Sequence, residues 1–278
     1  MEAKKLEFGS IYFDLYELDS GIFAAISADK FPTSNAGFFD LGNYLVVFDT
    51  LMDPYSTVDL IKASKQFTNK EPSFLINSHH HMDHLFGNRI FPTNVPIISS
   101  QETFMEAKKS LETRFKDFKE RAPAELKRTE AELLNEKNPN KILELKNDIN
   151  TWNEISKPSF NLRLPNVVVN DSFSIKGTKN QVQIIFIGAA HTKGDIIAFF
   201  EKEKICFMGD LLFEKTDPGW VTTPGIAVPP NPTRLRDMLL EYADKDIEVY
   251  VPGHGNLSTK KQLRENAEFY DKYYIKKK

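Results

Sequence analysis

The chain has 278 residues, of which 41% are hydrophobic, and this provides enough apolar material for a substantial core. Its formal net charge of −3 argues against the strongly basic surface that is typical of nucleic-acid-binding proteins. No apolar run approaches the roughly 20 residues that a membrane-spanning helix needs, so the sequence indicates neither a nucleic-acid nor a membrane partner.

The N-terminus and the cysteine content bear on the cellular compartment. The first ten residues contain no continuous apolar stretch of the kind found in secretion signals, which favours a cytoplasmic location, although a leader removed earlier would leave no trace. Cys206 is the only cysteine, so an internal disulfide is excluded. We expect its thiol to be buried, because free cysteines usually behave as small core residues. The sequence leaves the oligomeric state open.

Short strands separated by polar turns dominate the first fifty residues. The predicted strands cover 11–18, 22–27, 37–40 and 45–49. A helix is expected from Pro54 to about Phe67. Its expected buried positions include Val58, Ile61 and Ala63. A short, fully apolar strand is predicted next, at 74–76.

Residues 101–157 have a different pattern, because apolar residues recur there at helical spacing. They fall into two runs, Phe104, Leu111, Phe115 and Phe118, then Ile142, Leu145, Ile149 and Trp152. Pro123 and Pro139 interrupt the region, which predicts a helical hairpin or a three-helix excursion. One interpretation is a solvated helical insertion packed on a single apolar stripe. The other is a lid or wall that shapes a substrate pocket.

The remaining elements are mainly strands, with helices towards the C-terminus. The predicted strands are 167–169, 182–187, 196–200, 205–208 and 247–251, and the predicted helices are 232–242 and 259–274. Two β-rich halves with helices outside them indicate an α/β fold, a four-layer αββα sandwich, better than a simple parallel sheet. We expect one domain over residues 1–278, with the helical insertion 101–157 inside it.

Four of the six histidines fall within residues 79–84, directly after a predicted buried strand. These four are His79, His80, His81 and His84. Neutral imidazole is the commonest metal ligand in proteins. In an extended segment the side chains of His79 and His81 lie on one face, and a following turn would present Asp83 and His84 to a neighbouring point. The cluster therefore predicts a metal site.

The other two histidines and one carboxylate follow strands of the second half. His191, Asp210 and His254 each come directly after a predicted strand. Loops at strand ends commonly carry chemistry on a rigid scaffold. We expect the Asp210 carboxylate to bridge two cations, and the alternative is that it caps the next turn.

Taken together, these residues resemble the signature of the metallo-β-lactamase superfamily, whose αββα sandwich carries its site at one edge, between two sheets. The resemblance extends from the early strands to the segment Pro252-Gly253-His254-Gly255. It implies a first metal held by His79, His81 and His191. It implies a second metal held by Asp83, His84 and His254, with Asp210 shared between the two. Asp49 matches a position that usually supports the site by orienting a ligand.

The donor set and the resemblance together predict two divalent metal ions. Histidine and carboxylate ligands favour zinc, with iron or manganese as alternatives. Two cations about 3.5–4 Å apart can share a water and lower its pKa, so the expected nucleophile is a metal-bound hydroxide. Asp83 is expected to bind metal and to orient or take up a proton. Members of the superfamily that reduce oxygen usually have Glu where His81 stands, which argues against a redox role.

The expected reaction is hydrolysis of an ester, lactone or amide bond in a small molecule, with a β-lactam as one candidate. The run His79-His80-His81-x-Asp83-His84 is also similar to glyoxalase II, so a thioesterase is the alternative, and a di-iron redox protein ranks below both. Lys193 is expected either to meet a substrate carboxylate or to be solvated. Pocket walls are mainly apolar, and the candidate contributors, each with core packing as the alternative, are Trp220, Phe86 and Trp152.

Overall fold

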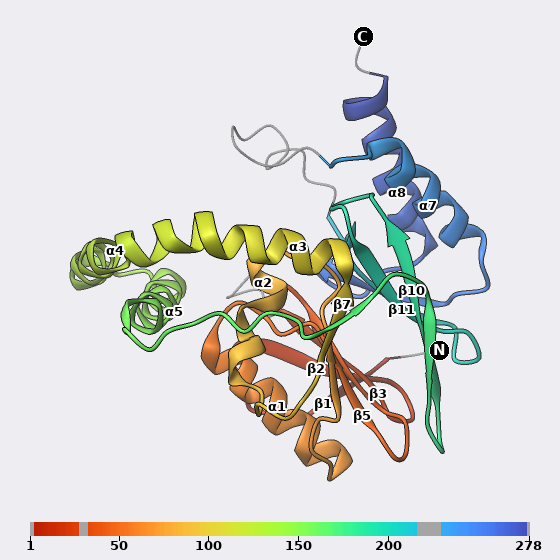
Figure 1. Ribbon diagram of the computed structural model, residues 1–278, viewed down its shortest axis with the longest axis horizontal. Coiled ribbons are helices and arrows are strands. Elements are labelled where there is room, and N and C mark those ends of the chain that lie inside the picture. Colours follow the sequence, from red (N-terminus) through yellow and green to blue (C-terminus); the bar gives the residue numbers. More distant parts are fainter. Residues whose placement is uncertain (1–2, 28–32, 216–228, 277–278) are drawn as a thin grey trace.

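The computed structural model describes residues 3–27, 33–215 and 229–276, and the strands among them form two sheets (Figure 1). In these ranges the first sheet has eight strands in chain order. Its strands are β1 (Lys4–Leu6), β2 (Phe13–Asp19), β3 (Ile22–Ser27), β4 (Ala36–Asp40), β5 (Leu45–Phe48), β6 (Phe74–Ile76), β7 (Ile97–Ser100) and β8 (Val167–Val169). Neighbouring strands are antiparallel from β1 to β5 and parallel from β5 to β8.

The second sheet has five strands within the described residues, in the order β13-β12-β11-β10-β9. Its strands are β9 (Phe173–Lys176), β10 (Gln181–Gly188), β11 (Asp195–Phe200), β12 (Ile205–Phe213) and β13 (Val249–His254). Strands β12 and β13 are parallel, and the other pairs are antiparallel. Predicted strands matched most of these elements, but the short strands β1, β7 and β9 were not predicted.

The main core lies between the two sheets. The Phe39 ring, from β4, lies 4.8 Å from the rings of both Phe200 on β11 and Phe207 on β12, in edge-on arrangements. All three side chains are almost fully buried. Cys206 is also fully buried, on the opposite face of β12, as expected. Because apolar residues face both sides of the inner strands, these strands appear in the sequence as continuous hydrophobic runs.

Helices cover the two outer faces and complete the αββα sandwich that the sequence predicted. Helix α1 (Pro54–Thr68) packs on the first sheet, and helices α7 (Pro232–Asp244) and α8 (Lys260–Tyr270) pack on the second. A π-helical turn (Asp271–Ile275) follows α8. Among the described residues, no helix is long and apolar enough to cross a membrane.

Helix α1 begins where the sequence predicted, and of its three expected buried positions only Ala63 is fully buried. The Asp53 side chain accepts hydrogen bonds from the backbone N–H groups of Tyr55 and Ser56, and a proline at the first helical position fits this cap. Leu60 and Ala63 are buried, whereas the expected Val58 and Ile61 are only half-buried. The face of α1 that packs on the sheet therefore carries mainly small and hydroxyl-bearing side chains.

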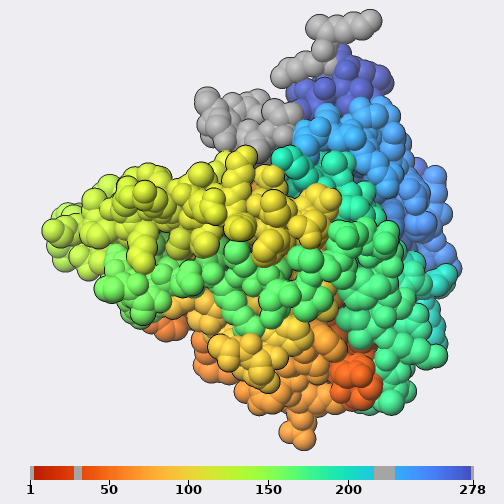
Figure 2. Space-filling view, in the orientation of Figure 1, coloured from red at the N-terminus to blue at the C-terminus, as the bar shows by residue number. Residues whose placement is uncertain are grey.

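Residues 101–156 form the α3–α5 segment, which projects from the sandwich (Figures 1 and 2). It consists of α3 (Gln101–Ser110), a π-helical turn (Leu111–Phe115), α4 (Lys116–Asn135) and α5 (Pro139–Ser156). The prediction that Pro123 interrupts the region was wrong, because Pro123 lies inside α4. A proline inside a helix removes one backbone hydrogen bond and crowds the preceding turn, yet α4 continues through it from Lys116 to Asn135. Pro139 does start a new helix, after an Asn138 cap.

Candidate metal centre

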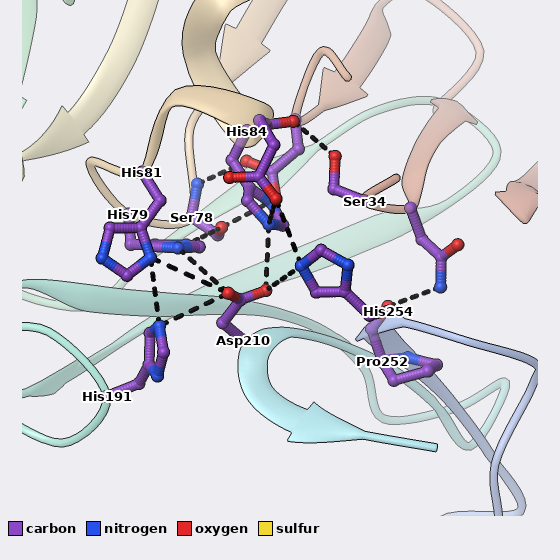
Figure 3. A network of polar contacts seen from close by, with 12 residues as sticks. Ser34, Ser78, His79, His81, His84, His191, Asp210, Pro252 and His254 are labelled. Atoms are coloured by element: carbon purple, nitrogen blue, oxygen red, sulfur yellow. Dashed lines mark hydrogen bonds and ion pairs between the residues drawn. The ribbon is translucent and has the colours of Figure 1, made fainter. Parts of the chain in front are cut away.

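The seven residues singled out in the sequence converge at one edge of the sandwich (Figure 3). One group places its candidate ligand atoms within 4.8 Å of one another, and it comprises His79, His81, His191 and Asp210. A second group does the same with Asp83, His84 and His254. Below, these are called the first and second subsites. They are built from segments that lie far apart in the sequence and meet only in the folded chain.

The segment that follows β6, up to the end of the short helix α2 (Met82–Leu85), carries four of the seven residues. A 3₁₀ turn (Phe86–Ile90) follows α2. The Asn77 side-chain amide donates to the carbonyl of His84 at 3.1 Å and to Asn88 Oδ1 at 3.0 Å, which fixes the path of this turn. His81 stands at the start of α2 with an extended backbone, at φ −66° and ψ 146°. The predicted change from extended chain to helix is therefore present, and it separates His79 and His81 from Asp83 and His84.

Asp210 lies between the two subsites. Its Oδ2 is 3.5 Å from His79 Nε2 and 3.3 Å from His191 Nε2. Its Oδ1 is 2.9 Å from His84 Nε2 and 3.4 Å from His254 Nε2. Each carboxylate oxygen thus faces a different group of imidazoles, which is the arrangement that a bridging ligand requires.

The position of Asp210 within its element differs from the prediction. Asp210 does not follow the end of a strand but lies inside β12, which continues to Phe213. Gly209 has φ +52°, and the pairing with β13 shifts register around it. A Cβ at Gly253 would lie only 2.0 Å from Asp210 Oδ1, so glycine there makes room for the carboxylate.

Asp49 orients two of the imidazoles from behind. Its Oδ2 lies 2.9 Å from His84 Nδ1 and accepts a hydrogen bond from Ser78 Oγ at 2.7 Å. Because the Ser78 hydroxyl donates to Asp49, it accepts from His79 Nδ1 at 2.9 Å. With each Nδ1 engaged in this way, Nε2 is the ring nitrogen of His79 and His84 that faces the site. Asp49 itself has φ +60°, a left-handed backbone conformation uncommon for a residue with a side chain.

His254 is held by contacts with residues near β4. Its Nδ1 donates to the carbonyl oxygen of Thr33 at 3.2 Å, so its Nε2 also faces the site. The buried Asn35 side-chain amide donates to the carbonyls of Pro252 at 2.9 Å and Gly255 at 2.8 Å. Sequence reasoning missed Asn35, because nothing in its neighbourhood shows that it meets a segment more than 200 residues later.

The two subsites differ in charge. Burial disfavours charge on Asp210, but the imidazoles of His84 and His254 outweigh burial and hold the pKa of this carboxyl well below its usual range. Burial alone would lower the pKa of both imidazoles, yet Asp210 and Asp83 raise the pKa of His84 well above its usual range and that of His254 to about 10. By contrast, burial and the neighbouring His84 hold the pKa of His79 well below its usual range.

Several buried polar atoms of the site lack hydrogen bonds to the described residues, and this tests whether a cation fits. The atoms among these that face the site are His79 Nε2, His84 Nε2 and Asp210 Oδ1. Although His84 Nε2 and Asp210 Oδ1 are 2.9 Å apart, their approach is not aligned for a hydrogen bond. Imidazole nitrogens and carboxylate oxygens that converge without hydrogen bonds suit a divalent cation. The residues present therefore fit a metal.

An aromatic side chain that the sequence did not single out contacts both subsites. The Phe213 ring stacks on the imidazole of His254, with centroids 5.4 Å apart and planes at 10°, and meets His191 edge-on at 5.9 Å. The Asn266 side chain from α8 donates to the Phe213 carbonyl at 2.8 Å. The signal for Phe213 was hidden because β12 was predicted to end at residue 208.

The other candidate residues have varied positions. Lys193 forms an ion pair with Glu106 of α3, with Nζ and Oε1 2.8 Å apart, and its side chain is 58% exposed. Phe86 is fully buried against the α3–α5 segment, which fits the core-packing alternative and not a pocket wall. Trp152 packs against the same cluster. Trp220 lies outside the described residues.

His80 belongs to neither subsite. Burial, followed by the effect of His81, lowers the pKa of His80 to about 4.

Comparisons with known proteins agree with this geometry. A family model described as the metallo-beta-lactamase superfamily matches residues 30–254. A search of curated proteins gives no match. Among solved structures, a metallo-beta-lactamase from Pontibacter korlensis superposes with a TM-score of 0.66 at 15% identity, over 94% of this chain and 99% of that one. FIM-1 from Pseudomonas aeruginosa, in a mono-zinc form, gives 0.64 at 14% identity, over 95% and 97%. At these identities the solved structures show a shared fold.

Proposed function

The chain belongs to the metallo-β-lactamase superfamily of metal-dependent hydrolases, and from that premise we propose that it uses two metal ions to hydrolyse an ester, lactone or amide bond in a small molecule. The observation that carries this proposal is the position of Asp210, with one carboxylate oxygen beside each group of imidazoles. A single-metal site would need only one of these groups.

We assign His79, His81 and His191 to the first metal, Asp83, His84 and His254 to the second, and Asp210 to both. Zinc is the metal that this mixture of imidazole and carboxylate ligands favours. The mono-zinc form of the structural relative FIM-1 supports the same choice. Iron and manganese are the alternatives that elemental analysis distinguishes.

Bound divalent cations would lower the pKa of a water and polarise the bond under attack. The chain's own contribution is orientation. Asp49 and Ser78 fix the rings of His79 and His84, and the Thr33 carbonyl fixes that of His254. Such fixed hydrogen-bond acceptors keep the ligands in place during the reaction without reorganisation.

Asp83 is the residue that we assign to orienting a water. Its side chain is 30% exposed, whereas that of Asp210 is 6% exposed, so Asp83 faces the opening of the site. Its Oδ2 lies 3.2 Å from His254 Nε2. Burial opposes ionisation, but His84 and His254 hold the pKa of Asp83 well below its usual range. An ionised carboxylate at the opening can accept a hydrogen bond from a water and orient it, and the low pKa favours this role over that of proton acceptor.

Phe213 supports an apolar group on the substrate. Its half-buried ring lies against His254 and His191, between the two subsites. Small-molecule sites combine apolar walls with a few placed polar groups. β-Lactams are candidate substrates because the structural relatives are metallo-beta-lactamases, and esters and lactones offer the same carbonyl chemistry.

Metal content followed by a substrate panel tests the proposal. Protein purified without chelator is analysed for zinc, iron and manganese, then assayed on β-lactam, lactone, ester, thioester and phosphodiester substrates. We expect two ions per chain and activity that chelator removes and zinc restores. Fewer than two ions per chain after supplementation would contradict the two-metal assignment. Turnover confined to thioesters would show that the protein is a thioesterase and not an ester, lactone or amide hydrolase. Oxygen consumption by an iron-loaded protein would show that the reaction is a redox reaction and not hydrolysis.

A further inference from the structure

The start of the α3–α5 segment contacts the turn that carries His191. Ser100 is the last residue of β7 and caps α3, since its Oγ accepts a hydrogen bond from the Thr103 backbone N–H at 3.1 Å. The same hydroxyl donates to the carbonyl oxygen of Gly194 at 2.6 Å. The Thr103 hydroxyl donates to that carbonyl at 2.9 Å. One backbone carbonyl thus accepts two hydrogen bonds from side chains that are fully buried.

The Gly194 carbonyl belongs to a tight turn that begins at His191. Asp195 accepts from the Thr192 backbone N–H at 2.8 Å and from its hydroxyl at 2.5 Å. The Gly194 N–H donates to the Thr192 hydroxyl at 3.3 Å. These contacts make the residues after His191 one compact unit. A hydrogen bond that fixes Gly194 therefore also fixes the direction from which His191 enters the first subsite.

Close packing shows that α3 lies directly on this turn. A Cβ added to Gly194 would lie 2.3 Å from Ser100 Oγ and 2.7 Å from the Thr103 backbone nitrogen. One helical turn further on, Glu106 of α3 forms its ion pair with Lys193. The contact between α3 and the His191 turn therefore has a buried, hydrogen-bonded part and a more exposed, charged part. Exposed ion pairs contribute little to stability, so we expect the buried hydroxyls to be the part of the contact that holds the turn.

A second contact joins the α3–α5 segment to the other side of the site. The Phe160 ring lies 5.1 Å from Phe115 of the π-helical turn and 5.4 Å from Phe86. Phe86 directly follows α2, which carries Asp83 and His84. The α3–α5 segment therefore has buried contacts near its base with the turn that carries His191 and with the chain around α2, which carries His84. A lid that opens would have to break these contacts.

We propose that Thr103 is a positioning residue: together with Ser100 it holds the His191 turn through the Gly194 carbonyl, which makes the base of the α3–α5 segment a fixed part of the first metal subsite. The inference rests on the proposed function insofar as His191 is taken as a ligand. The sequence left open whether this segment is a packed insertion or a lid or wall of the pocket. The proposal gives the base of the segment a structural role.

The test compares three threonine substitutions. Thr103→Val keeps the shape but removes the hydroxyl, and Thr103→Ser keeps the hydroxyl. Thr129→Val is the matched control, because Thr129 is also buried in this segment but its hydroxyl bonds to Glu125 of its own helix. We expect Thr103→Val to weaken zinc binding at the first subsite about 10-fold, the lower end of the range for losing an orienting partner. It should also lower kcat more than it raises KM. Thr103→Ser should stay close to wild type in both measurements.

Hydrogen–deuterium exchange separates this inference from the proposed function. Measured on chelator-treated protein, exchange in peptides covering residues 189–195 should be faster in Thr103→Val than in wild type or Thr129→Val. Since no metal is present, this comparison holds even if the protein proves to bind none. Equal exchange and equal zinc affinity in the two valine variants would overturn the inference. If Thr103→Val does not fold, Thr103→Ala takes its place under the same criteria.

Discussion

The metal-site edge of the sandwich and the outer part of the α3–α5 segment are stabilised in opposite ways. At the site edge, buried polar groups meet partners from distant parts of the chain, as Asn35 does with Pro252 and Gly255. In α4, ion pairs join residues three or four positions apart, such as Arg121 with Asp117. The first kind of contact exists only in the folded chain, whereas the second needs only a helix.

This difference predicts a gradient in the effect of substitutions. Removing one member of a buried polar network leaves its partners buried without hydrogen bonds, and this strongly lowers the free energy of unfolding. Removing one member of an exposed helical ion pair returns its partner to water, which costs little. The following substitutions are given in order of decreasing expected effect.

Asp210→Ala should have the largest effect. We expect loss of metal from both subsites and a fall in hydrolysis of more than about 100-fold, beyond the range for losing an orienting residue. His254→Ala should empty chiefly the second subsite, because Asp210 and three imidazoles remain at the first. Elemental analysis of both variants gives the comparison. Retention of both metals in Asp210→Ala would mean that the wrong carboxylate is assigned as the bridge.

Phe160→Ala should cost stability where the segment joins the sandwich. The ring is almost fully buried between Phe86 and Phe115, and the Arg89 guanidinium carbon lies 4.3 Å from its centroid. Truncation of such a ring costs about 3–5 kcal/mol. Urea unfolding measures the loss, with Leu134→Ala as the control, since Leu134 is 85% exposed in α4. Similar losses in the two variants would show that the aromatic cluster does not hold the segment.

Asp53→Asn should have a smaller effect, and one that depends on pH. Asp53 is buried at the start of α1, and burial raises its pKa to about 6, although the N–H groups of Ser56 and Tyr55 lower it. A raised folded-state pKa means that wild-type stability is lost as pH rises from about 4 to about 6. Relative to the asparagine variant, the wild type should lose about 2 kcal/mol across this window, since each pKa unit is worth about 1.4 kcal/mol.

Urea unfolding of both proteins at pH 4.5 and pH 7.5 checks the sign. The asparagine oxygen can still accept the hydrogen bonds from Tyr55 and Ser56, so the helix cap is preserved. A stability difference between the two proteins that is independent of pH would show that Asp53 ionises in the fold as readily as in water, and one that grows in the opposite direction would show that it ionises more readily.

Arg128→Ala should have the smallest effect. Its guanidinium contacts Glu125 and Glu132 on the same exposed face of α4. We expect no resolvable change in the urea midpoint, in metal content or in kcat/KM, because exposed ion pairs exchange readily for water. A clear loss of stability would mean that α4 depends on its surface charges, and the contrast between the two regions would then fail.

The ligand types and most of the helices and strands could be predicted from the amino-acid sequence alone. Four of the seven candidate ligands lie within residues 79–84, so their proximity is a local property of the chain. The strands of the inner core were predictable because burial on both faces requires continuous apolar runs such as 205–208. The αββα order followed from the alternation of these runs with helical patterns.

The contacts that hold the site in place form only in the folded chain and could not be predicted. The sequence shows a strand up to Met208, but β12 continues to Phe213 because β13 pairs with it, and this pairing brings Phe213 against His254. Pro123 reads as an interruption, yet it lies inside α4. The Gly194 carbonyl finds the hydroxyls of Ser100 and Thr103 across more than ninety residues. Such contacts leave no periodic signal, because a hydrogen bond depends on which atoms the fold brings within about 3 Å and not on spacing along the chain.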